Sequence, residues 1–116
     1  MQGRLLPKYQ GRYQAHPVGY WEDEFFVASS IGLDCIEFIL DFNDVEINPL
    51  MKDGGIEEIK KVIMDSGVQV NSICTDYFME APIHSEDKHV SKTSKEILTN
   101  LINKSSQLGI KDIVIP

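Results

Sequence analysis

The sequence predicts an α/β fold in which a parallel sheet is built from repeated helix–strand units. Three segments share one pattern: an amphipathic helix, a glycine and then a short apolar strand. The glycines are Gly32, Gly67 and Gly109, so the pattern recurs twice after its first occurrence. Glycine commonly ends a helix in the left-handed conformation, and a strand that closely follows each helix favours parallel pairing.

The helices are expected where apolar residues recur every three or four positions. The first covers Glu22–Ser30, with Phe25, Phe26 and Ala28 on its apolar side. The second ends before Gly67, and its apolar face comprises Ile56, Ile59, Val62 and Ile63. The third ends before Gly109, and its apolar stripe comprises Ile97, Leu98, Leu101, Ile102, Ser105 and Leu108.

The strands are expected at Cys35–Leu40, Val68–Cys74 and Asp112–Ile115. These segments are almost continuously apolar, which is typical of parallel strands that are covered on both faces. Cys35 and Cys74 therefore both lie in expected strands, and their separation does not suit a metal site. We expect two buried thiols, with a disulfide between them as the alternative.

The period of the repeat indicates a partial domain. Extended backwards, it places the preceding glycine upstream of Met1, so the chain is expected to contain only the tail of strand 1, followed by helix 1 through strand 4. A complete (β/α)8 barrel takes about 250 residues. Residues 1–116 are therefore expected to form roughly half of a TIM barrel, as a fragment of a longer protein, and a flavodoxin-like open parallel sheet is the alternative. Either sheet has open edges, so we expect self-association or pairing with a remaining C-terminal half.

Composition narrows the class of protein. Hydrophobic residues make up 42% and charged residues 25% of the chain, as in ordinary globular proteins. No apolar run reaches the roughly 20 residues of a membrane-spanning helix, and the start does not resemble a secretory signal, so a cytoplasmic protein is expected. The formal net charge of −7 disfavours nucleic acid as a partner.

Ligands of parallel sheets bind beyond the carboxyl ends of the strands. This rule selects three loops, which are Gln2–Tyr20, Asp41–Asn48 and Thr75–His89. Within the last loop, Asp76 and Tyr77 can hydrogen-bond a hydroxylated ligand, beside an apolar wall of Phe78 and Met79. His84 and His89 have no metal-type spacing, so we expect a solvated surface there.

Two charged positions near the expected strand ends need an explanation. Glu37 interrupts an apolar strand, and burying it without a partner is costly, so it must face either solvent or a polar pocket.

The first loop contains arginines, whose side chain suits phosphate or carboxylate groups. Arg4 lies nearest the expected strand end, whereas Arg12 and Lys8 are expected to be solvated. The second QGR triplet, Gln10–Arg12, is expected to be a coincidental repeat.

The segments MQGRL, GLDCIEF, EINPL and VNSICTDYFMEAP, in this order, resemble the sugar phosphate isomerase/epimerase family of xylose-isomerase-like TIM barrels. The resemblance covers nearly the whole chain but only the N-terminal half of such a protein. It implies interconversion of sugars, often phosphorylated, by proton transfer next to a carbonyl through an enediolate. It also implies a divalent metal (Mn, Co, Mg or Zn) in the full-length protein.

In that family the metal ligands and the acid–base glutamates come from later strands. The resemblance therefore assigns no catalytic or metal residue to this chain, which we expect to be inactive alone. The substrate-binding residues it implies are Gln2, Arg4, Glu37, Cys74, Asp76 and Tyr77. Two alternatives stay open: a DNA-repair barrel of the AP-endonuclease type, which the acidic net charge disfavours, and a non-catalytic half-barrel binding module.

Overall fold

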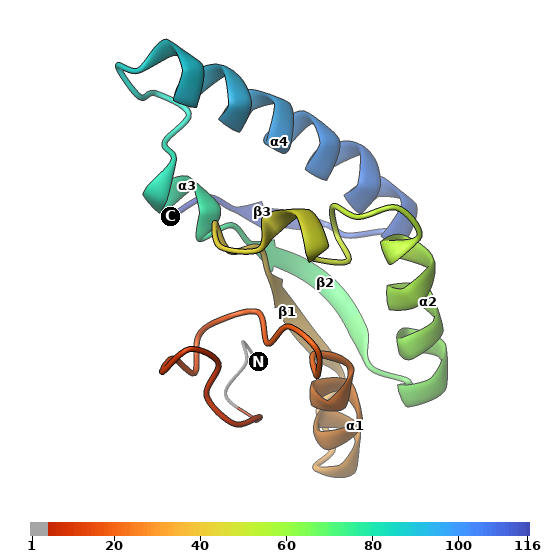
Figure 1. Ribbon diagram of the computed structural model, residues 1–116. Coiled ribbons are helices and arrows are strands. Elements are labelled where there is room, and N and C mark those ends of the chain that lie inside the picture. The colour runs from red at the N-terminus through yellow and green to blue at the C-terminus, as the bar shows by residue number, and fades with distance from the viewer. Residues whose placement is uncertain (1–4) are drawn as a thin grey trace.

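The computed structural model describes residues 5–116 and confirms a parallel α/β fold (Figure 1). Its strands are β1 (Cys35–Ile39), β2 (Gln69–Cys74) and β3 (Asp112–Val114), which pair in parallel in the order β1-β2-β3. The helices are α1 (Glu22–Ser30), α2 (Gly55–Ser66), α3 (Tyr77–Glu80) and α4 (Lys88–Leu108), and a short 3-10 helix, η1, covers Val45–Ile47.

Gly67 and Gly109 end α2 and α4 as the sequence predicts, whereas the C-cap of α1 is Ile31, the residue before Gly32. Gly67 and Gly109 cap α2 and α4 in the left-handed conformation, with φ of 75° and 69°. At the first of these caps, the Gly67 N–H donates to the Ile63 carbonyl at 2.8 Å and closes the last turn of α2. A side chain at either position would strain the backbone, so each glycine both stops its helix and turns the chain toward the next strand.

The segment between β2 and α4 is more helical than expected. It contains α3, and α4 begins at Lys88 because the Asp87 side chain accepts hydrogen bonds from the N–H groups of His89 and Val90. This is an ordinary N-cap, and it satisfies two donors that the first turn of a helix otherwise leaves free. The prediction of a continuous loop over Thr75–His89 was therefore wrong, because a side-chain cap and a single helical turn shorten it.

The strand order distinguishes the two expected architectures. If β1–β3 are the second to fourth strands of the parent sheet, a flavodoxin-like order would separate β1 from β2, whereas they pair directly. The connections from β1 to β2 and from β2 to β3 therefore each lead to the next strand in the same direction across the sheet. Because such connections are right-handed, their helices lie on the same face of the sheet. Figure 1 shows α1, α2 and α4 following one another along one side of the sheet. This arrangement is compatible with part of a β/α barrel.

The core lies between this sheet face and the helices. Phe25 and Ala28 from α1, Ile59 from α2 and Leu101 from α4 pack in one cluster with strand residues that include Ile36, Phe38, Val70 and Ile73. Two residues that the sequence pattern placed on apolar helix faces, Phe26 and Ile102, are instead exposed. Both lie at the edge of the apolar face of their helix, where the spacing of apolar residues alone does not distinguish buried from exposed positions.

The opposite sheet face is polar at its centre. Ile36 pairs with Val70, and after an irregularity in the register Glu37 pairs with Ser72 and Ile39 with Cys74. Because neighbouring side chains in a strand alternate between faces, Glu37 and Ile39 lie on the face away from Ile36 and Phe38. Glu37 accepts a hydrogen bond from the Ser72 hydroxyl at 2.6 Å, so its partner is on the neighbouring strand.

The cysteines and the outer strand depart from a fully buried sheet. Cys74 is buried, whereas Cys35, at the start of β1, is exposed, so the expectation of two buried thiols was half wrong. Both are free thiols in the structure. Val114, the last residue of β3, and Ile115, which follows it, are exposed. Within residues 5–116, no helix has the length and apolar character needed to cross a membrane.

The contrast between Leu101 and Ile102 is testable. Leu101 is fully buried and Ile102 is 51% exposed, although the sequence places both on one stripe of α4. We expect Leu101→Ala to lower the free energy of unfolding by about 2–5 kcal/mol, because it leaves a cavity in the core. Ile102→Ala is the matched control and should stay within roughly 0.5 kcal/mol of the wild type. Urea unfolding followed by circular dichroism measures both, and equal losses would contradict this packing.

Candidate functional site

The candidate site lies where β1 and β2 end. Ile39 and Cys74 are register partners at the last positions of these strands, and an aspartate follows each of them by two residues. The two aspartates, Asp41 and Asp76, are both buried, with 6% and 8% of their surfaces exposed. Main-chain bonds from Leu40 N–H to Cys74 O and from Tyr77 N–H to Leu40 O continue the pairing past the strand ends. Two buried carboxylates are therefore held at one edge of the sheet.

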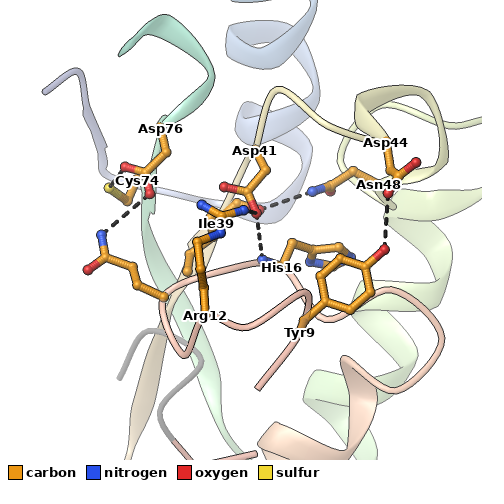
Figure 2. Close-up of polar contacts among 10 residues, drawn as sticks. Tyr9, Arg12, His16, Ile39, Asp41, Asp44, Asn48, Cys74 and Asp76 are labelled. Carbon is orange, nitrogen blue, oxygen red and sulfur yellow. Dashed lines mark hydrogen bonds and ion pairs between the residues drawn. The ribbon is translucent and has the colours of Figure 1, made fainter. Parts of the chain in front are cut away.

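Asp41 is held by the N-terminal loop. Its Oδ2 accepts a hydrogen bond from the His16 main-chain N–H at 2.8 Å and lies 3.7 Å from Arg12 Nη2 (Figure 2). Burial raises the pKa of the Asp41 carboxyl above its ordinary value, and the charge of Asp76 adds to this shift. The His16 N–H and the Arg12 guanidinium act in the opposite direction. The carboxylate thus carries a desolvation penalty that its two partners offset in part.

Asp76 accepts a hydrogen bond at each of its two carboxylate oxygens. The Cys74 thiol donates to Asp76 Oδ1 at 3.3 Å, and the Gln14 amide donates to Oδ2 at 3.4 Å. The Gln14 contact is long for a hydrogen bond to a carboxylate, whose usual range is shorter, so it is a weak bond. Asp76 therefore links the end of β2 to the same N-terminal loop that holds Asp41.

A tight turn aims Arg12 at this site. Tyr9 and Arg12 exchange two main-chain hydrogen bonds of 2.9 and 3.0 Å around Gln10 and Gly11. Both central residues have positive φ, 49° and 78°, as a two-residue hairpin turn of the primed type requires. The second QGR triplet therefore contains a hairpin turn within the loop, and Arg12 is exposed, as expected, while it also pairs with Asp41.

Two further contacts fix the loop that follows β1. The Tyr9 hydroxyl donates to Asp44 Oδ2 at 3.0 Å, which ties the hairpin turn to this loop (Figure 2). Asn48 is buried, and its side chain donates to the Ile39 carbonyl at 3.0 Å and accepts from the Leu50 N–H at 2.9 Å. Asn48 thereby gives the carbonyl at the end of β1 a side-chain partner and fixes the start of the next turn.

The side chain of His16, in the N-terminal loop, is buried against aromatic rings. Its ring lies 5.3 Å from the ring of Phe38 and 6.2 Å from that of Trp21, measured between centroids. Burial lowers the pKa of the imidazole from 6.5 to about 4. His16 is therefore neutral at pH 7, and its main-chain N–H rather than its ring contacts Asp41.

A cavity of about 40 Å³ opens beside these side chains. Its described lining combines three acidic residues with a cation, an amide and two apolar side chains: Asp41, Asp76, Glu80, Arg12, Asn43, Phe42 and Met79. Phe42 is partly exposed and packs on the Tyr77 ring at 5.3 Å between centroids. Carboxylates, an amide, a guanidinium and an exposed aromatic ring can together bind a hydroxylated ligand.

The sequence-predicted site residues fall in three places. Gln2 and Arg4 lie outside the described residues. Asp76 lines the cavity and Cys74 contacts it, while Glu37 lies farther back on the same face of the sheet as Cys74. Tyr77 is buried in the core, where it supports Phe42 from behind. Burial raises the pKa of its phenol, and hydrogen bonding with Ser94 partly counters this shift.

The six predicted site residues omitted several that meet at the cavity. Asp41 and Phe42 follow β1 directly, and Arg12 and Gln14 reach the strand ends from the N-terminal loop. For Asp41 a signal existed, because it stands at the same offset from β1 as Asp76 does from β2. Arg12 and Gln14 had none, since their approach depends on the turn at Gln10–Gly11. Of the expected apolar wall, Met79 lines the cavity and Phe78 is part of the core.

The donor set does not make a metal centre. In the part of the chain that the structure describes, no group of three histidine, cysteine, aspartate or glutamate side chains is arranged to hold a metal ion. Asp41 and Asp76 are two carboxylates, and both face Arg12 and Gln14 rather than a third ligand. The divalent metal that the family resemblance implies does not fit these residues, and no chemical step is assigned to it here.

His16 provides a pH test of the loop. Because its pKa falls from 6.5 to about 4 on folding, its contribution to stability is complete above pH 6.5 and is lost as the pH falls toward 4. The loss amounts to about 3 kcal/mol at 1.36 kcal/mol per pKa unit. We expect His16→Phe, which keeps the aromatic packing, to lose less stability than the wild type between pH 7 and pH 4.5 in urea unfolding. Equal losses would contradict a buried, neutral His16.

Two comparisons with known proteins bear on this site. No protein-family model matches the chain. Among curated proteins, the chain is 29% identical over 104 residues to the L-ribulose-5-phosphate 3-epimerase UlaE of Escherichia coli O139:H28 and, equally, to that of Shigella boydii serotype 18. Both matches cover 86% of this chain and 36% of the relative.

A third relative is named a putative L-ribulose-5-phosphate 3-epimerase. SgbU of Haemophilus influenzae is 28% identical over 95 residues, which covers 80% of this chain and 33% of the relative. The chain thus spans about a third of the length of the curated relatives it matches. The chain is therefore similar, over most of its own length, to proteins named as L-ribulose-5-phosphate 3-epimerases.

Proposed function

We propose that this chain is the N-terminal part of a sugar phosphate isomerase or epimerase with a TIM-barrel fold, and that it supplies part of the substrate pocket. The reaction is proton removal next to the sugar carbonyl, formation of an enediolate and return of a proton to the carbon skeleton. In a 3-epimerase the proton leaves and returns at carbon 3, on opposite faces, so the substrate is inverted there without net gain or loss of atoms.

One observation carries the proposal. Asp41 and Asp76 are buried side by side at the carboxyl ends of adjacent parallel strands, beside a cavity that Arg12 also lines. This is the edge of a parallel β/α sheet at which ligands bind. The similarity to L-ribulose-5-phosphate 3-epimerases over 86% of the chain supports the class of substrate.

The residues of this chain act by binding and orienting the sugar. Asp41 and Asp76 accept hydrogen bonds from sugar hydroxyls, and the Arg12 guanidinium donates to sugar oxygens. Correct orientation of the carbon that loses its proton lowers the entropic part of the barrier. Glu37, on the polar face of the sheet, and Gln2 and Arg4 remain substrate-binding candidates. We place the acid–base groups and the divalent metal in parts of the parent protein beyond this chain.

The other two functions have less support. A DNA-repair barrel must bind phosphodiesters, and this cavity carries three carboxylates among its described lining residues. A non-catalytic binding module explains the cavity but not the similarity to epimerases. The exposed Val114 and Ile115, at the end of β3, suit pairing with the rest of a barrel.

Arg12 and Lys8 provide a matched test, since both are exposed cations on one loop and Arg12 lines the cavity. In the complete product of the gene, assayed with L-ribulose 5-phosphate and added Mn²⁺ or Co²⁺, we expect Arg12→Ala to lower kcat/KM roughly tenfold or more, because it loses a charge-assisted hydrogen bond to the substrate. Lys8→Ala should change kcat/KM by less than about twofold.

Two results would count against the proposal. One is the absence of epimerase or isomerase turnover across a panel of ketoses and ketose phosphates, each tested with several divalent metals. The other is an equal effect of Arg12→Ala and Lys8→Ala on a protein that does turn over. Turnover by the 116-residue chain alone would contradict the placement of the acid–base groups outside it.

A further inference from the structure

The size of the cavity beside Asp41 and Asp76 limits what enters it. Its volume is about 40 Å³, whereas a cavity needs at least about 10–15 Å³ to hold one water molecule and one of roughly 150 Å³ binds benzene. This is room for a hydroxymethyl group and not for a whole sugar.

The charge around the cavity favours a hydroxyl over a phosphate group. Among its described lining residues, three carboxylates, those of Asp41, Asp76 and Glu80, face the single guanidinium of Arg12. Arg12 already lies 3.7 Å from Asp41. A phosphate placed here would meet like charges in a partly desolvated setting, whereas a hydroxyl donates hydrogen bonds to the same oxygens.

An aromatic surface lies at the opening. Phe42 is 44% exposed, lines the cavity and is supported by Tyr77, with the two rings tilted by 40° and 5.3 Å apart. An exposed phenyl ring that rests on a second, buried ring is well placed to cover the C–H face of a carbon chain. It offers nothing to a phosphate.

We infer that this cavity binds the uncharged hydroxymethyl end of a polyol or sugar and excludes phosphate. The inference rests on the proposed function and adds an orientation to it. A phosphorylated substrate lies with its phosphate directed away from Asp41 and Asp76, and the unphosphorylated end enters between them against Phe42. Arg12 donates to a hydroxyl oxygen of that end while it remains paired with Asp41.

The direct test is a titration of the 116-residue chain followed by the NMR shifts of its backbone amides. L-ribulose is expected to shift the amides of Phe42, Asn43 and Asp76. Inorganic phosphate at the same concentration is expected to leave them in place. Shifts of these amides with phosphate but not with L-ribulose would overturn the inference.

Two substitutions sharpen the test. Phe42→Ala should weaken L-ribulose binding about fivefold, the scale of one lost aromatic contact. Phe26→Ala is the matched control, since Phe26 is 46% exposed and lies on α1, and it should change binding by less than about twofold. Equal effects of the two substitutions would contradict the role of Phe42.

Asp76→Asn tests the exclusion of phosphate. It keeps the shape of the side chain and removes one charge, so inorganic phosphate should bind roughly tenfold more tightly than to the wild type. Glu80→Gln, at an exposed lining position, removes a charge without touching Gln14 or Cys74 and should act in the same direction. Unchanged exclusion of phosphate in both variants would show that charge does not select the ligand.

The inference and the proposed function fail in different ways. If L-ribulose binds the cavity but the complete protein turns over no ketose, the function fails and the binding site stands. If the complete protein is an epimerase and phosphate shifts the amides of Phe42 and Asp76, the orientation is wrong and the function stands.

Discussion

The parallel pairing of β1 with β2 determines the position of every group in the candidate site. Because Ile39 and Cys74 are register partners at the strand ends, the aspartates two residues farther on are neighbours although 35 residues separate them in sequence. A register shift of one residue would move one aspartate to the other face of the sheet. The packed core that holds the register, in which Phe38 and Ile73 are buried, is therefore also what holds the two carboxylates together.

Burying two carboxylates at one edge has a cost that the N-terminal loop offsets. The His16 N–H and the Arg12 guanidinium both counteract the rise in the pKa of Asp41. Gln14 and Cys74 donate hydrogen bonds to the carboxylate oxygens of Asp76. The same contacts attach the loop to the sheet, so the loop and the carboxylates stabilise one another. A ligand hydroxyl that enters the cavity adds donors to oxygens that are only partly satisfied.

The acidic character of the cavity also bears on substrate orientation. The similar proteins are named for a phosphorylated ketose, yet the cavity that this chain builds is richer in carboxylates than in cations among the residues described. The two facts agree if one substrate presents different ends to different parts of the protein. Hydroxyls then contact this chain and the phosphate is bound elsewhere, which is a division of roles that strand-end loops of a barrel permit.

Local patterns in the sequence determined the repeating elements. The bounds of α1, the glycines that end α2 and α4, and the three strands followed from periodicity and from the conformational freedom of glycine. The sequence also indicated that polar residues after the strands, Asp76 among them, belong to a site, because the carboxyl edge of a parallel sheet is where loops meet. These features depend on neighbours along the chain, and short-range physics is enough to predict them.

Only the tertiary structure decided which residues meet. Arg12 reaches Asp41 because Gln10 and Gly11 form a tight turn, and Tyr77 turns into the core because α3 interrupts the loop that contains it. The sequence pattern likewise could not show that Leu101 is covered while Ile102 is exposed, or that Cys35 is open to solvent. Each of these outcomes depends on what lies opposite a residue in space, and periodicity along one chain carries no information about that.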